Sequence, residues 1–173
     1  FLDTLALAPD FVEAVNNLGL VYATMGRHQQ AIATYQRALA IRAETAMTYL
    51  NIGISLEALT RALEARTHYL RALEIDRTLA KANDALGLLH AKRGEFELAR
   101  QYFAAETEVN PKFAEGHNHL GLIYLSLNQP QDAVAPLVRA TKLNPKHADA
   151  HNNLGLALKR LGEIAPAGAS FRA

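Results

Sequence analysis

The stretch that decides the fold runs from residue 114 to residue 147 and reads AEGHNHLGLIYLSLNQPQDAVAPLVRATKLNPKH. Apolar residues recur in it at helical spacing on both sides of a turn at Asn128. The next stretch, which starts at Ala148, carries the same Leu-Gly-Leu step at the same distance from its start. Two successive stretches with one pattern indicate a protein built from repeated helical hairpins.

The repeat continues through almost the whole chain in frames of 34 residues, without insertion or deletion. We call the positions within a frame places, and the frames begin at Val12, Ala46, Ala80, Ala114 and Ala148. Place eight is always glycine, at Gly19, Gly53, Gly87, Gly121 and Gly155. Place twenty is always alanine, at Ala31, Ala65, Ala99, Ala133 and Ala167. Place twenty-four is large and apolar, at Tyr35, Tyr69, Phe103, Leu137 and Phe171.

This set of places resembles the tetratricopeptide-repeat signature, in which Leu-Gly, Ala, a bulky residue and Pro recur at fixed offsets. The resemblance implies an all-α fold, a right-handed α-α superhelix of helix-turn-helix repeats that forms one solenoid over residues 1–173. We expect the end of a preceding second helix over 1–11, followed by repeats over 12–45, 46–79, 80–113, 114–147 and 148–173, the last one incomplete. Glu106 interrupts the alanines of place twenty-seven and is expected to soften the third repeat.

The glycines of place eight indicate close packing. Glycine inside a helix costs about 1 kcal/mol relative to alanine, so its recurrence needs a compensating contact. We expect the compensation to be a close approach of the paired helix, with the alanines of place twenty as partners. The turn between the two helices of each repeat is expected around Gly26, Thr60, Gly94, Asn128 or Gly162.

Polar residues at places five and six are the candidate binding residues. By resemblance, these places line the concave groove of such a solenoid, and they hold Asn16, Asn17, Asn51, Asp84, Asn118, His119, Asn152 and Asn153. An asparagine amide offers a donor and an acceptor together, so it can pair with a peptide backbone. Asparagines at place six are similar to those of the repeat arm of O-linked N-acetylglucosamine transferases, although Ala85 and His119 depart from that series. The alternative is that these amides bond between neighbouring helices.

A second known mode of binding, the carboxylate clamp of chaperone-binding repeats, does not match. It requires basic residues at places two, five and six and an asparagine at place nine. Place nine is apolar throughout, at Leu20, Ile54, Leu88, Leu122 and Leu156, and place two has a basic residue only at Lys81. We therefore expect a groove with an apolar floor and an amide rim, binding a protein or peptide other than a chaperone tail.

Composition and charge argue against several other functions. The net charge of +1 gives no reason to expect nucleic acid, and no apolar run approaches the length of a membrane span. The chain has no cysteine, and His147 and His151 lack the partners that would complete a metal site. No nucleophile motif or phosphate-binding loop is present, so we expect no enzyme activity, no metal and no cofactor.

The two ends suggest further hypotheses. Apolar residues there would be left exposed, among them Phe1, Leu2, Leu5, Leu158, Leu161 and Phe171. One interpretation is that the chain is a fragment of a longer array. Another is a self-assembling structural solenoid that stacks head-to-tail into a filament. A third is the substrate-recruiting arm of a larger enzyme, such as a glycosyltransferase.

Overall fold

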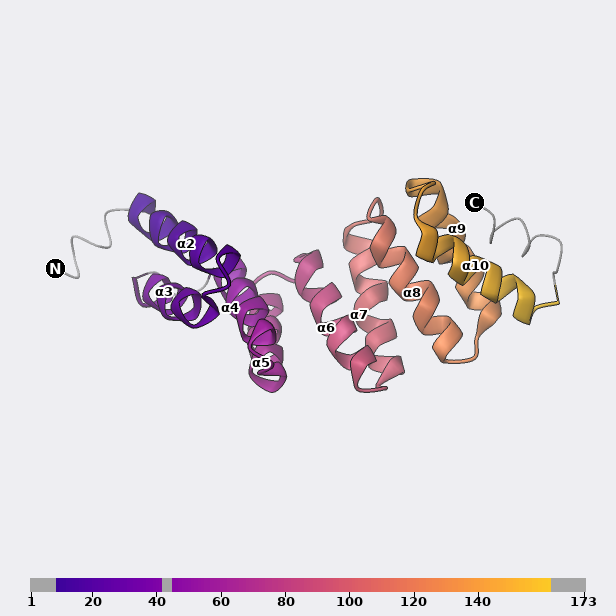
Figure 1. Ribbon diagram of the computed structural model, residues 1–173, viewed down its shortest axis with the longest axis horizontal. Helices are drawn as coiled ribbons and strands as arrows, with labels where there is room; N and C mark the ends of the chain where they lie inside the picture. Colours follow the sequence, from indigo (N-terminus) through magenta and orange to yellow (C-terminus); the bar gives the residue numbers. More distant parts are fainter. Residues whose placement is uncertain (1–8, 42–44, 163–173) are drawn as a thin grey trace. The chain divides into compact units, whose positions relative to one another are not determined.

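The computed structural model describes residues 9–41 and 45–162, and over these residues the chain forms nine α-helices and no strand (Figure 1). The expected all-α fold is confirmed. The helices divide between two compact units, residues 1–82 and 83–173, which we describe separately. The expected end residues Phe1, Leu2, Leu5 and Phe171 lie outside the described residues.

The first unit contains two helical hairpins. Helices α2 (Pro9–Thr24) and α3 (His28–Ile41) form one, and α4 (Ala46–Ala58) and α5 (Ala62–Ile75) form the other. α3 also packs against α4, so each hairpin covers an apolar face of the next.

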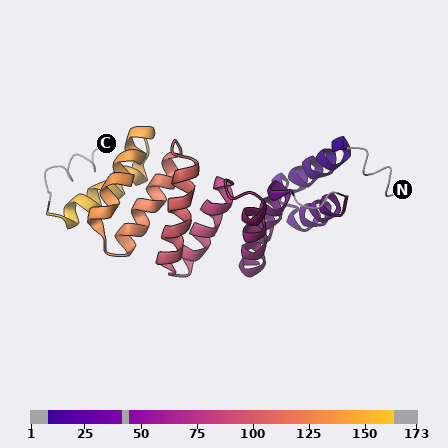
Figure 2. The same ribbon diagram turned by 180° about the vertical axis from the view of Figure 1, so that it is seen from behind.

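The second unit continues the pattern with helices that lie side by side in chain order (Figures 1 and 2). These are α6 (Ala80–Lys92), whose first residues precede the division, α7 (Phe96–Val109), α8 (Ala114–Ser126), α9 (Pro130–Leu143) and α10 (Ala148–Arg160). α8 contacts α7, α9 and α10, so it is the central helix of this unit. Four of the first helices, α4, α6, α8 and α10, begin at place one of their frames, whereas α2 begins three residues earlier, at Pro9.

The predicted turns are all present, at the same place of every frame. Gly26, Gly94 and Gly162 have positive φ, and so do Thr60 (φ 61°) and Asn128 (φ 57°). This left-handed conformation ends each first helix and reverses the chain, which is why glycine recurs there. Thr60 adopts it against the preference of a β-branched residue.

In the first four repeats, the glycine of place eight lies against the large side chain of place twenty-four. A Cβ on Gly87 would lie 2.7 Å from the Phe103 ring, and one on Gly19 would lie 2.5 Å from the Tyr35 ring. The compensating contact is therefore this large side chain on the paired helix, rather than the alanine of place twenty that the sequence had suggested. The burial of these side chains offsets the cost of a glycine inside a helix, because Tyr35, Tyr69, Phe103 and Leu137 are all at most 1% exposed.

Candidate functional site

The predicted groove residues all lie on first helices. Asn16 and Asn17 are on α2 and Asn51 is on α4, in the first unit. The second unit carries Asp84 on α6, Asn118 and His119 on α8, and Asn152 and Asn153 on α10. The recurring frame gives these side chains equivalent positions within each hairpin. Their contacts nevertheless differ between the two units.

In the first unit, most of the candidate amides have no partner of their own. The Thr48 hydroxyl donates a hydrogen bond of 3.0 Å to Asn16 Oδ1. Asn17 is exposed and Asn51 is half-buried, and within the described part of the chain neither side chain makes a hydrogen bond. Several large apolar side chains of the same two helices are also exposed, and we call three of them the apolar strip: Leu20 (50%), Met47 (48%) and Ile54 (45%).

In the second unit, four of the five candidate residues bond to one another from helix to helix, and Asn152 is exposed. His119 Nδ1 lies 2.8 Å from Asp84 Oδ1, which links α8 to α6. Asn153 Nδ2 donates a hydrogen bond of 2.9 Å to Asn118 Oδ1, which links α10 to α8. Each bond joins place five of one repeat to place six of the next. The alternative interpretation, that these residues bond between helices, therefore describes the second unit.

Glu115, at place two of α8, joins the two pairs, and sequence reasoning missed it. Its Oε1 lies 3.2 Å from His119 Nε2 and accepts a 3.4 Å hydrogen bond from Asn118. Its Oε2 lies 2.6 Å from His147 Nε2, though not in hydrogen-bonding geometry. The available signal was the spacing, because a carboxylate at place two is four residues before place six on one helix face.

Glu106 on α7 was singled out in the sequence as an interruption of the alanines of place twenty-seven, but it was not among the candidate site residues. Its side chain is 1% exposed, and neither carboxyl oxygen has a hydrogen-bond partner among the residues that the structure describes. Gly116 on α8 makes room for it, because a Cβ there would collide with Glu106 Oε2. The interruption of the alanine series at place twenty-seven was the sequence signal, and the compensating glycine lies ten residues later.

Two pKa values shift in this cluster. Burial raises the pKa of Glu106 to about 7, helped by the nearby Asp84 charge and opposed by His119. Burial lowers the pKa of His119, but the hydrogen bond to Asp84 and the charges of Asp84, Glu115 and Glu106 outweigh it, so the net shift is upward. The His119 ring also lies on the Phe103 ring, with centroids 5.0 Å apart.

Leu158 and Leu161, which were expected to be exposed at one end of the chain, are not exposed in the structure. Leu158 is 8% exposed and packs with Leu125, Leu137 and Leu154, so it belongs to the core rather than to an exposed end. Leu161 is half-buried. The packing of Leu158 against α8 and α9 therefore removes it from the surface.

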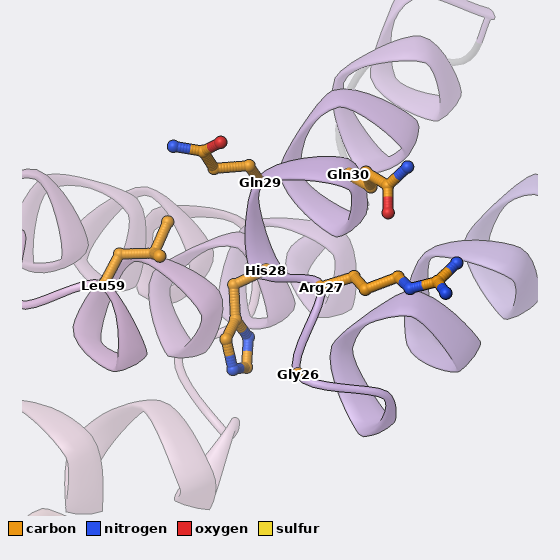
Figure 3. Close-up of a pocket in the computed structure, with 6 residues that line it drawn as sticks. All are labelled: Gly26, Arg27, His28, Gln29, Gln30 and Leu59. Atoms are coloured by element: carbon orange, nitrogen blue, oxygen red, sulfur yellow. The ribbon is translucent and has the colours of Figure 1, made fainter.

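A hollow of about 310 Å³ occurs elsewhere, at the turn between α2 and α3 in the first unit (Figure 3). It is lined by residues 26–30 and by Leu59, and none of the predicted groove residues reaches it. Figure 3 shows that Gln29 and Gln30 point away from each other at the start of α3. The hollow is open and carries no cluster of convergent polar groups.

No group of three or more histidine, aspartate or glutamate side chains in residues 9–41 and 45–162 has the arrangement of a metal site. None of the helices in these ranges combines the length and the apolar character that a membrane crossing demands.

Family comparisons agree with the repeat frame. Models of the tetratricopeptide repeat match residues 11–78 and 85–137, and a further TPR-repeat model matches residues 122–162. A search of curated protein sequences finds no match.

Solved structures share the fold. A structure of MamA is 23% identical with a TM-score of 0.80, covering 89% of this chain and 90% of that one. PilF of Pseudomonas aeruginosa is 21% identical with a TM-score of 0.81, over 93% of this chain and 73% of that one. YrrB, described as a TPR protein with an unusual peptide-binding site, is 21% identical with a TM-score of 0.77, over 90% and 80% of the two chains.

Proposed function

Because the chain belongs to the tetratricopeptide-repeat family, we propose that it is a non-catalytic protein-interaction scaffold that binds an extended segment of a partner protein along its first helices. The observation that carries the proposal is the pairing of unused amides with exposed apolar side chains in the first unit. Asn17 lies three residues from Leu20, and Asn51 lies three residues from Ile54, so each pair shares one helix face.

The chemistry of these faces suits an extended peptide. Each amide offers a donor and an acceptor to a peptide backbone, and the apolar strip offers contact area to side chains on alternate residues. Backbone hydrogen bonds hold an extended segment with little selectivity, and the apolar contacts then set the preference for sequence. The description of YrrB as having a peptide-binding site supports this kind of ligand by analogy.

The candidate amides divide into two roles. Asn17, Asn51 and Asn152 are the residues that we assign to the partner, since within the described residues their side chains form no hydrogen bond. Asn118 is 4% exposed and uses both ends of its amide within the protein, so we assign it to holding α8 against its neighbours.

Selection from a displayed library of random peptides tests the proposal. A selected peptide should lose about tenfold or more in affinity when Asn17 and Asn51 are both replaced by alanine, as measured by fluorescence polarisation. Gln36→Ala is the matched control, because Gln36 is an exposed amide on the second helix α3. Equal affinity of the double variant and the control would place the binding surface elsewhere.

A second candidate function is self-association through α2. Leu18 is 44% exposed and Val21 is 51% exposed. The residues at the place of Leu18 in the other repeats are buried, namely Ile52, Leu86, Leu120 and Leu154. A second copy of the chain could cover this face, and a contact between unlike faces that does not close would build a filament. Sedimentation equilibrium of the wild type and of Leu18→Glu tests this candidate, because a wild type that stays monomeric at high concentration contradicts it.

A further inference from the structure

Glu106 occupies a position that demands a neutral side chain. The corresponding residues of the other described repeats are Ala38, Ala72 and Ala140, all at most 1% exposed. A carboxylate with both oxygens buried and unpartnered would lose its hydration without compensation, so the group binds a proton instead. The carboxyl fits there only because Gly116 on α8 has no side chain.

His119, on the same helix as Gly116, is in the opposite situation. Its Nδ1 faces Asp84 at 2.8 Å and its Nε2 faces Glu115 at 3.2 Å. A neutral imidazole has one N–H and could serve only one of these carboxylates, whereas an imidazolium serves both. The geometry therefore favours the charged ring, which ties α6 to α8 between two acidic side chains.

We propose that Glu106 and His119 form a pH-sensitive contact, which we call the clasp. It holds α6 and α7 against α8 while both groups are protonated, and it weakens as the pH rises through neutrality. The clasp would hold the helices of the second unit together, because His119 ties α6 to α8 and Glu106 of α7 lies against Gly116 of α8. It goes beyond the proposed peptide binding and does not depend on it.

The ionisable groups that face the clasp come from three helices. Asp84 of α6 and His119 of α8 act on Glu106, and Asp84, Glu115 of α8 and Glu106 of α7 act on His119. From the turn before α10, His147 reaches Glu115. Among the described residues, no charged side chain of α9 or α10 contributes to either shift.

The two groups act in the same direction on stability. The pKa of Glu106 is about 7 in the folded chain against 4.5 ordinarily. Between these two values the folded chain keeps a proton that the unfolded chain has lost, so stability decreases as the pH rises through this interval. The pKa of His119 is raised above 6.5, so its contribution is complete below that value and disappears as pH rises through the folded value. In both cases the folded state binds more protons than the unfolded state, and stability falls with rising pH.

Urea unfolding of the whole chain between pH 5 and pH 8 tests the clasp without any ligand. Glu106 alone should lower the folding equilibrium constant on the order of fiftyfold over this range. Glu106→Ala installs the residue of the other repeats and should abolish most of the decline. Glu106→Gln, which keeps the size and removes the charge, should abolish it as well, so the test survives if one variant folds poorly.

The matched control is Glu108→Gln, an exposed glutamate two residues along the same helix, which should keep the wild-type decline. Replacing His119 by asparagine, the residue of place six in three other repeats, should remove the remaining part of it. An equal pH dependence of wild type, Glu106→Ala and Glu106→Gln would overturn the proposal.

Hydrogen exchange locates the opening. After correction for the intrinsic pH dependence of exchange, protection of the α7 and α8 amides should fall from pH 6 to pH 8, while protection of the α4 and α5 amides stays constant. Uniform loss of protection in both units, or a Glu106 carboxyl that titrates in NMR near its ordinary value, would contradict a clasp at this position. Failure of the peptide selection would leave these readouts unaffected, so the two proposals fail separately.

Discussion

The two units share one repeat frame and one way of packing hairpins, yet they use the equivalent polar places differently. In the first unit, Asn17 and Asn51 make no hydrogen bond within the part of the chain that the structure describes, and they lie beside the apolar strip. In the second unit, Asp84, His119, Asn118 and Asn153 are joined in pairs from helix to helix. The comparison teaches that a place in the frame determines where a side chain lies, whereas its neighbours determine whether it is available to a partner.

The largest effect is expected at the glycines of place eight, which both units contain. Gly53→Leu and Gly87→Leu should each lower the free energy of unfolding by about 3 kcal/mol or more, because the added side chain meets the Tyr69 or Phe103 ring. Urea denaturation measures both. If the variant in one unit leaves the midpoint unchanged, the hairpins of the two units are not built by the same contact.

A smaller effect should distinguish the units. Asn118→Ala should cost about 1–3 kcal/mol, because it removes the partner of Asn153 and a donor to Glu115 in a buried setting. Asn51→Ala, at place six of the first unit, should stay within about 0.5 kcal/mol since its amide makes no bond. Thermal or chemical unfolding of the pair checks the difference, and equal losses would mean that the amides have the same role in both units.

The smallest effect is expected at a turn. Thr60→Gly should stabilise the first unit by about 1 kcal/mol, because glycine adopts a positive φ without the clash of a β-branched side chain. Asn128→Gly, at the same place in the second unit, should gain less since asparagine tolerates this conformation. A gain at Asn128 as large as that at Thr60 would refute the explanation by strain.

The repeat frame made the fold predictable from the sequence, whereas the side-chain contacts between repeats were harder to predict. The turn places and the close approach at place eight follow from glycine, whose reasons are local. The partner of that glycine was misassigned, because two residues of the same helix both recur and the period alone does not say which one faces it. Glu106 was missed because the glycine that makes room for it, Gly116, belongs to the next repeat, and a reading frame by frame does not compare place twenty-seven of one repeat with place three of the next. Glu115 was missed although its partners lie in its own repeat, because its spacing of four residues from His119 was not considered.

The side-chain amide signals of asparagine in a two-dimensional NMR spectrum, recorded with and without a selected peptide, test the central claim most directly. We predict that the signals of Asn17 and Asn51 move on binding and that those of Asn118 stay in place, because its amide is already engaged within the second unit. Movement of the Asn118 signals with unchanged Asn17 and Asn51 signals would contradict the division of roles between the two units.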